Sequence, residues 1–274
     1  NKGFEITVDY SKQVQEVGIM FRANFSFNKN KIIEDDTADR PYEWLNSRGH
    51  SLNTYFGYVC DGFYSEDDIA NPDVPKLKGV AMQPGDLKYR DLNGDNVIDA
   101  YDKCYIGNPT VPQIVYGFGA TFTWRNFYLG AFFQGVGKSD ISLSASNFKP
   151  FSDGSAKGNL YANIVNRWSP ANPSPDAEWP RLDYGMSSNT ENYQMSTFWL
   201  RDGSYLRMKT LDFGYNIPDA FVKKLRLNSF RVYFQAYNLF TISKFKMWDV
   251  ELGAGDGTAY PNTRSFNIGV NFSF

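Results

Sequence analysis

Residues 264–274 alternate strictly between apolar and polar side chains. Every second residue from Phe266 to Phe274 is apolar, and the residues between them are Asn, Gly or Ser. A two-residue period is typical of a β-strand with one apolar and one polar face. The segment also has the length, about 9–11 residues, with which a tilted strand crosses a bilayer. The pattern indicates a membrane-crossing strand, with the closing strand of a soluble β-sandwich as the alternative.

The same alternation recurs in six segments before it. They are residues 4–10, 19–28, 113–124, 127–134, about 207–215, and 230–238. Only Arg125 and Asn126 separate two of these segments, which predicts a β-hairpin with a two-residue connection. Arg207 and Lys209 share the face of Leu211, so we expect them to lie above the hydrocarbon zone or beyond a β-bulge. We expect a turn at residues 11–16.

The connections between these seven segments alternate between short and long. Residues 29–112, 137–203 and 239–263 show no sustained period, and the run from Tyr55 to Tyr64 is expected to form a local strand inside the first of them. Aromatic residues gather at the short-turn ends, and the face opposite the apolar one is mostly Gly, Asn, Thr, Ser, Gln and Arg. Alternation alone also fits a sandwich. Short turns, long outer loops and aromatic girdles favour an antiparallel transmembrane β-barrel, in which seven strands would be a portion of a larger, even-numbered set.

Composition narrows the choice of function. Aromatic residues make up 17% of the 274 residues, and the formal net charge of −2 gives no reason to expect nucleic-acid binding. No run of 18 apolar residues predicts a transmembrane helix. His50 is the single histidine, so neither a Ser-His-acid triad nor a histidine metal site is expected, and we predict that the protein is not an enzyme. Cys60 and Cys104 could pair in an oxidising compartment.

Residues 91–102 carry the sharpest local motif. Oxygen-bearing side chains stand at loop positions 1, 3, 5, 9 and 12, and position 7 would offer a backbone carbonyl, which is the ligand spacing of a calcium loop. Position 6 is Asn96, a residue that tolerates the left-handed conformation needed there. The alternative is a solvated turn in which Asp and Asn side chains bond their own backbone. The predicted ligands of a structural Ca²⁺ are Asp91, Asn93, Asp95, Val97, Asp99 and Asp102.

Several longer segments, taken in order, resemble SusC/RagA-type TonB-dependent transporters. They are P-G-D-L-K-Y-R-D-L-N-G-D-N-V-I-D (84–99), I-G-N-P-T-V-P-Q-I-V-Y-G-F (106–118), F-F-Q-G-V-G (132–137), S-Y-L-R-M-K-T-L-D-F-G-Y-N-I-P (204–218), R-V-Y-F-Q-A-Y-N-L-F-T (231–241) and Y-P-N-T-R-S-F-N-I-G-V-N-F-S-F (260–274). The resemblance implies that residues 1–274 are the C-terminal segment of a barrel of about 22 strands in the outer membrane of Bacteroidetes. It also implies that the plug domain and the TonB-contacting segment lie outside these residues.

The resemblance further implies a function in nutrient uptake. Transporters of this type import oligosaccharides or peptides, with a SusD-like surface lipoprotein as a lid, energy from the TonB complex, and membrane lipid and lipopolysaccharide around the barrel. Trp44, Trp168, Trp179 and Trp248 fall in expected outer loops, where they could stack on sugars or simply pack the loops. The second functional hypothesis is a soluble, calcium-dependent carbohydrate-binding or adhesion sandwich.

Overall fold

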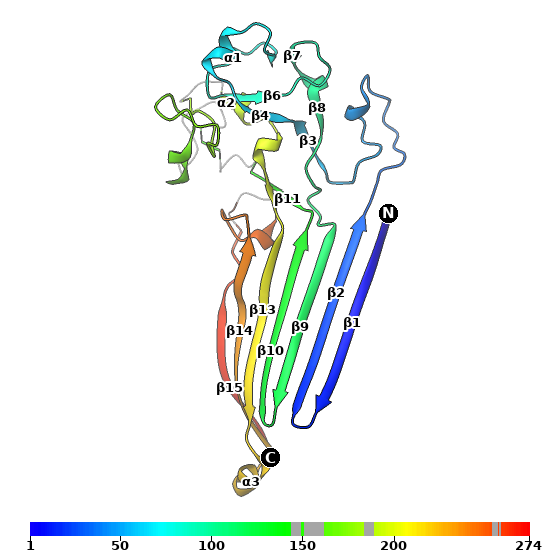
Figure 1. Cartoon of the computed structure of the whole chain (residues 1–274), viewed down its shortest axis with the longest axis vertical. Helices are drawn as coiled ribbons and strands as arrows, with labels where there is room; N and C mark the ends of the chain where they lie inside the picture. Colours follow the sequence, from blue (N-terminus) through cyan, green and yellow to red (C-terminus); the bar gives the residue numbers. More distant parts are fainter. Residues whose placement is uncertain (144–148, 151–161, 184–188, 254–256, 258) are drawn as a thin grey trace.

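The main body of the chain is one seven-stranded antiparallel sheet (Figure 1). The computed structural model describes residues 1–143, 149–150, 162–183, 189–253, 257 and 259–274. The strand order is β1-β2-β9-β10-β13-β14-β15. Their bounds are β1 Lys2–Val14, β2 Val17–Lys29, β9 Ile114–Trp124, β10 Phe127–Gly137, β13 Tyr205–Asn216, β14 Ser229–Ser243 and β15 Ser265–Ser273. Every strand predicted from the two-residue period is present, and Arg125 and Asn126 form the expected two-residue hairpin.

Two strand boundaries differ most from the prediction. β1 continues through Val14, so the first hairpin turns on Gln15 and Glu16 alone rather than on residues 11–16, with Gln15 at a φ of 51°. β14 continues to Ser243, five residues beyond the expected end at Asn238. In β1, polar residues break the apolar alternation, whereas in β14 a register shift at Asn238 and Leu239 interrupts it. The backbone ladder goes on in both places, because main-chain pairing does not depend on side-chain polarity.

The two faces of the sheet have opposite chemistry. The apolar residues of each strand form the outer face, where large side chains lie open: Ile268 is 83% exposed, Phe266 60% and Phe4 54%. The four other sheets of the described residues have two strands each and lie in the connections, so no second sheet covers this face. A soluble sandwich requires such a cover, and its fold is therefore not the one observed. No helix among the described residues is long and apolar enough to cross a membrane.

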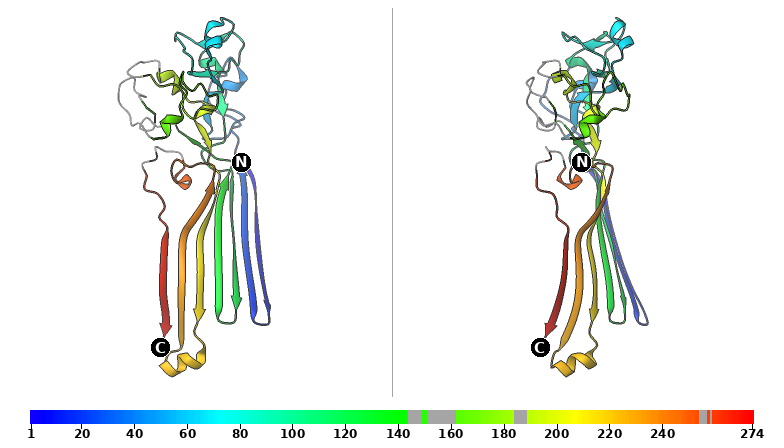
Figure 2. Two further views of the ribbon diagram at one scale, coloured as in Figure 1. Left: turned by 60° about the vertical axis from the view of Figure 1, so that its left-hand side comes forward. Right: turned by 90° about the vertical axis from the view of Figure 1, so that its left-hand side faces the viewer.

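The ends of the sheet also differ. The short connections, including α3 Asp219–Val222 and η5 Lys223–Leu225, lie at the end where β15 finishes (Figure 1). Rings from neighbouring strands meet there, with Phe127 centred 4.5 Å from Tyr215 and 6.4 Å from Trp124. These contacts place aromatic side chains at the short-turn end, as predicted. The three long connections gather at the opposite end, where the N-terminus also lies (Figure 2).

We call the described residues of the connections 30–113, 138–204 and 244–264 the loop module. Its strands pair locally, and Tyr55–Tyr58 and Cys60–Phe63 confirm the local strand expected near residues 55–64. Its elements are η1 Glu43–Leu45, β3 Tyr55–Tyr58, β4 Cys60–Phe63, α1 Glu66–Ala70, β5 Lys76–Leu77, β6 Leu87–Tyr89, β7 Val97–Ile98, η2 Ala100–Asp102, β8 Lys103–Ile106, β11 Asp140–Ser142, η3 Ala162–Asn166, α2 Asn189–Asn192, η4 Thr197–Trp199, β12 Leu200–Asp202 and η6 Val250–Leu252.

The loop module has a hydrophobic core to which all three connections contribute. Leu87 and Ile98 come from the first connection, Trp199 from the second and Phe245 from the third, and the first three are fully buried. A buried polar centre joins the first two connections: Asp86 pairs with Arg181 at 2.6 Å and accepts a hydrogen bond from the Asn192 side chain at 2.8 Å. The long connections therefore fold together as one packed body above the sheet.

Candidate functional site

The inner face of the sheet carries polar side chains and tyrosines. Near the short-turn end, the Arg231 guanidinium lies 4.4 Å from the ring centre of Tyr128 and 5.2 Å from that of Tyr233. Asp212 lies 3.8 Å from Arg231 and accepts hydrogen bonds from Tyr128 and Gln235. Cation–π contacts and ion pairs of this kind hold side chains against the wall in fixed orientations. The face opposite the apolar one is thus polar and ordered.

Glycines on neighbouring strands make room for these rings. A Cβ atom at Gly214 would lie 2.4 Å from the Tyr128 ring, and one at Gly269 would lie 2.4 Å from the Tyr233 ring. Real Cβ atoms do not approach a ring so closely, so the two tyrosines lie flat over strand positions that only glycine can occupy. This cross-strand pairing of an aromatic residue with glycine pins strand register and keeps the inner surface smooth.

A β-bulge at Lys209 changes the facing of β13. The register with β10 passes from Phe132↔Thr210 directly to Phe133↔Met208, so Lys209 is an extra residue on β13. Beyond it, Arg207 aligns with the inner-face residue Gln134 instead of with the apolar row. Of the two alternatives predicted for Arg207 and Lys209, the β-bulge is present: Lys209 forms it and Arg207 lies beyond it. Leu211, on one side of the bulge, points to the outer face of the sheet. Because of the extra residue, Arg207 on the other side points to the inner face.

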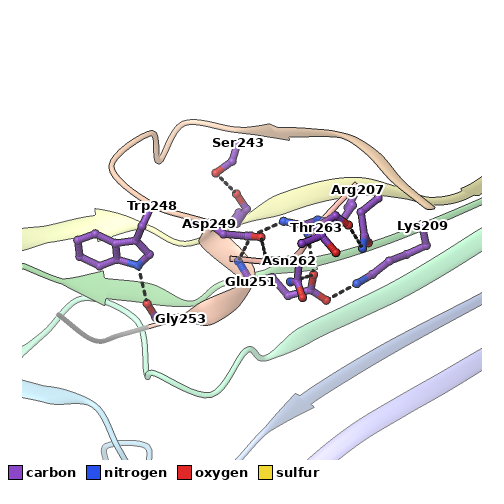
Figure 3. A network of polar contacts seen from close by, with 11 residues as sticks. Arg207, Lys209, Ser243, Trp248, Asp249, Glu251, Gly253, Asn262 and Thr263 are labelled. Atoms are coloured by element: carbon purple, nitrogen blue, oxygen red, sulfur yellow. Dashed lines mark hydrogen bonds and ion pairs between the residues drawn. The ribbon is translucent and has the colours of Figure 1, made fainter. Parts of the chain in front are cut away.

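Arg207 and Lys209 bind the third connection through an ion-pair network (Figure 3). Arg207 donates to Asp249 and lies 3.2 Å from Glu251, and Lys209 donates to the other oxygen of Glu251. Asn262 adds two hydrogen bonds, from its backbone N–H to Asp249 at 3.1 Å and from its side chain to Glu251 at 2.9 Å. We call these five residues the Arg207 network. It fastens the loop at 244–264 to the inner wall.

The Arg207–Asp249 ion pair of this network is buried, and both side chains are charged. The Arg207 and Asp249 side chains are 4% and 9% exposed. Although burial raises the pKa of Asp249, hydrogen bonds and the charge of Arg207 bring it below the usual value. The carboxylate therefore stays ionised at neutral pH, and the pair is both charged and hydrogen-bonded, as a buried ion pair must be.

The predicted calcium ligands lie together in one loop. Asp91 accepts hydrogen bonds from the N–H groups of Gly94 and Asn96, and Asn96 takes the left-handed conformation expected at position 6, with a φ of 64°. Asn93 accepts from Asp95, Asp95 from Val97 and Asp99 from Tyr101. Val97 belongs to β7, which pairs in parallel with β5. The arrangement is a chain of Asx turns that gives the loop one defined shape.

Asp102, the predicted ligand at position 12, lies beneath this loop. Its side chain is fully buried, accepts from the N–H groups of Leu92 and Asp99 at 2.8 Å, and closes a capping box with Asp99. Burial raises the pKa of Asp102, against these hydrogen bonds, which lower it. Within the described residues, no three His, Cys, Asp or Glu side chains converge as a preformed metal site. The donor types suit calcium, while the oxygens are turned toward backbone amides, so calcium binding remains a prediction.

The four tryptophans expected in outer loops lie in the loop module. Trp168 and Trp179 are 9% and 2% exposed, which leaves little of either ring for a sugar. Trp44 stacks on Tyr42 at 4.6 Å and donates its Nε1–H to the carbonyl of Tyr101. Trp248 lies beside the Arg207 network and bonds the carbonyl of Gly253 (Figure 3). The packing role considered for these residues holds for the two buried ones.

The remaining titratable side chains considered in the loop module are two cysteines, the histidine and one buried lysine. Cys60 and Cys104 are free thiols, so the possible disulfide is not formed, and burial raises the pKa of Cys60 to about 11. His50 stacks on the ring of Tyr105 at 4.3 Å. Lys149 is 4% exposed, donates to the carbonyl of Tyr193, and lies 5.2 Å from the ring centre of Trp199. Burial lowers the pKa of Lys149 to about 8.

The whole chain aligns with proteins of one kind. It is 28% identical to TonB-dependent receptor P3 of Formosa agariphila over 100% of its length, and 22% identical to TonB-dependent receptor SusC of Bacteroides thetaiotaomicron over 92%. The chain is a homologue of TonB-dependent receptors. Proteins of this kind reside in the outer membrane, and the outer membrane is where this chain belongs. No protein-family model matches it.

Solved structures agree on the fold. The chain superposes on the RagAB peptide transporter with a TM-score of 0.71 and 22% identity, covering 99% of this chain and 29% of that one. The open-open state of the RagAB peptide importer gives a TM-score of 0.69. The chain spans 28% of the length of receptor P3 and 24% of that of SusC. The seven strands are therefore part of the outer-membrane fold of these transporters, and the barrel is not closed within them.

Proposed function

We propose that residues 1–274 form part of the barrel wall and the substrate-facing loops of a transporter that takes up a nutrient oligomer, a glycan or a peptide, across the outer membrane. The observation that carries this proposal is the alignment of the entire chain with TonB-dependent receptors. The exposed apolar outer face suits contact with lipid, and the polar inner face suits a water-filled lumen. The relatives are receptors and transporters rather than enzymes.

The same similarities support three partners for the transporter: a surface lipoprotein, the TonB complex and the membrane lipids. The match to SusC and to the RagAB assembly supports a SusD-like surface lipoprotein that meets the loop module. Energy would come from the TonB complex through a region outside residues 1–274, as the resemblance implies. Lipid and lipopolysaccharide would contact the outer face.

Uptake by cells tests this proposal. A strain lacking the gene for the full-length protein should lose accumulation of a labelled oligomer that the parent strain takes up, and a TonB-deficient strain should lose it equally. Fluorescent oligosaccharides and labelled peptides, tested separately, assign the substrate class. Uptake of all of these oligomers at parental rates in both strains would contradict the proposal.

We also propose that Ca²⁺ binds the loop from Asp91 to Asp102 and stiffens the loop module. The donor spacing and the left-handed Asn96 support it. Calorimetric titration of the full-length protein, stripped of divalent ions, should give Ca²⁺ binding that Asp95→Asn weakens and that Asp73→Asn leaves unchanged. Asp73 is an exposed residue outside the loop. Absence of a binding isotherm would remove the calcium site.

A further inference from the structure

A cavity lies where the third connection folds against the inner wall. It is open to solvent, has a volume of about 250 Å³, and is lined by residues of β13, β14 and the loop 244–264, among them Arg207, Lys246, Trp248, Asn262 and Arg264. Sites for drug-sized ligands usually have roughly 300–1,000 Å³. The cavity is therefore of a size to take one residue of an oligomer rather than a whole one.

The charge of the lining is positive once the ion pairs are taken into account. Arg207 and Lys209 are balanced by Asp249 and Glu251 within the Arg207 network. Lys246 and Arg264 then remain, and neither makes an ion pair with any residue that the structure describes. Two cations beside a cavity of this kind attract an anion.

Arg207 adds a donor without an acceptor. Its residue exposure is only 3%, and its Nε atom is buried with no hydrogen-bond partner among the described residues, although the two terminal nitrogens are occupied by Asp249 and Glu251. A buried N–H without a partner costs roughly 1–3 kcal/mol relative to a bonded one. The unmade hydrogen bond belongs to a side chain that lines the cavity, and an acceptor atom that reaches this Nε–H would complete it.

We propose that this cavity binds a carboxylate group carried by one residue of the transported oligomer. Lys246 and Arg264 supply the charge, Arg207 supplies the Nε–H donor, and Trp248 supplies an apolar surface for the carbon skeleton of that residue. The carboxylate belongs either to a uronic acid of a glycan or to an acidic or terminal residue of a peptide. This inference rests on the proposed uptake function and specifies part of its substrate.

Ligand-observed NMR on the purified full-length protein in detergent tests the inference. Saturation transfer and titration would use galacturonate and galactose as one pair of probes, and N-acetylglutamate amide and N-acetylglutamine amide as the other. At least one carboxylate probe should bind at least ten times more tightly than its neutral partner. The pair in which the difference appears identifies the source of the carboxylate.

Two variants tie the binding to this cavity. Lys246→Gln combined with Arg264→Gln changes two exposed side chains and should weaken carboxylate binding at least tenfold. Lys244→Gln is the matched control, because Lys244 lies two residues away with an 88% exposed side chain that does not line the cavity, and it should change affinity less than twofold. Equal binding of charged and neutral probes, no binding of either carboxylate, or an unaffected double variant would each overturn the inference.

The binding assay is independent of transport. Purified protein needs neither TonB nor a lipoprotein partner to bind a probe, so failure of uptake in cells would overturn the proposed function and leave the binding result intact. Conversely, normal uptake of an uncharged oligomer together with a negative binding assay would remove only the carboxylate site.

Discussion

The sheet and the loop module keep their apolar side chains in opposite places. In the sheet, large apolar residues such as Ile268 and Phe266 lie open on the outer face. In the loop module, Trp199, Leu87 and Ile98 are fully buried against residues from other connections. The difference shows that one chain is built for two solvents. In the proposed transporter, lipid would complete the packing of the sheet, whereas the loop module packs its own hydrophobic core.

The sharpest test of this comparison replaces one tryptophan by alanine in each region. Trp199→Ala should destabilise the loop module by about 3–5 kcal/mol, because it removes a fully buried ring. Trp124→Ala, on the 45% exposed outer-face tryptophan, should leave the module unchanged. Amide hydrogen exchange of the module, measured beside the heat-modifiable gel mobility of the barrel, separates the two effects. Equal loss of protection in both variants would show that the regions are not distinct.

The second test places a charge on each face of one strand. Ile268→Arg should cost about 2–4 kcal/mol and reduce the amount of barrel assembled in the outer membrane, because it puts an arginine against lipid. Asn267→Arg, on the adjacent inner-face residue of β15, should assemble at near-normal levels. Quantifying folded protein in outer-membrane fractions gives the result. An inner-face variant that fails as badly as the outer-face one would refute the facing assigned to β15.

The third test measures how the stability of the loop module depends on pH through the buried amine of Lys149. Burial lowers the pKa of Lys149 from 10.5 to about 8, so the unfolded module binds this proton more tightly and stability rises as pH increases from about 8 to 10. Lys149→Met should stabilise the module by about 2 kcal/mol at pH 7, with the advantage shrinking toward pH 10. Hydrogen exchange at both pH values measures it, with exposed Lys244→Met as the control. A constant difference would rule out titration of Lys149.

The smallest expected effect concerns the contact between the two regions. Asp249→Asn should weaken the Arg207 network by about 1 kcal/mol and speed tryptic cleavage at Lys246 and Arg264. Since the pKa of Asp249 is lowered in the folded protein, its contribution is present above about pH 4 and is lost as pH falls through the folded value. Asp219→Asn, at the opposite end of the sheet, should not alter cleavage. Unchanged cleavage in the Asp249 variant would mean that the network does not hold the loop.

The sheet was predictable from the sequence and the loop module was not. Alternation in segments such as 264–274 reports a local period of two, which depends only on neighbouring residues. The core of the loop module joins Leu87 to Trp199 and Phe245, and no local pattern records which distant residues meet. The end of β1 was missed because polar residues there belong to the ladder without showing the period, and the end of β14 was missed because an irregularity at Asn238 and Leu239 interrupts the period.

The candidate sites differ in the same way: the site built from neighbouring residues was predictable from the sequence, and the one built from distant residues was not. The loop from Asp91 to Asp102 was found because its donors are adjacent in sequence, and the left-handed Asn96 was expected from its position. The Arg207 network was missed. Arg207 and Lys209 stood out as charges in an apolar row, but their partners Asp249 and Glu251 lie some forty residues away in an irregular connection. The carboxylate cavity depends on the same long-range contacts.

The extra residue Lys209 has a consequence for the boundary between the two solvents. On the short-turn side of Lys209, odd-numbered residues of β13 such as Leu211 and Phe213 lie on the outer face. On the other side the alternation is reversed, and Arg207 lies on the inner face. A single inserted residue thus shifts the alternation so that Met208 and Leu206 stay on the outer face while Arg207 turns inward. Flattening the bulge while keeping Lys209 in the strand would turn Arg207 to the apolar face, so one backbone irregularity decides which side of the wall this arginine faces.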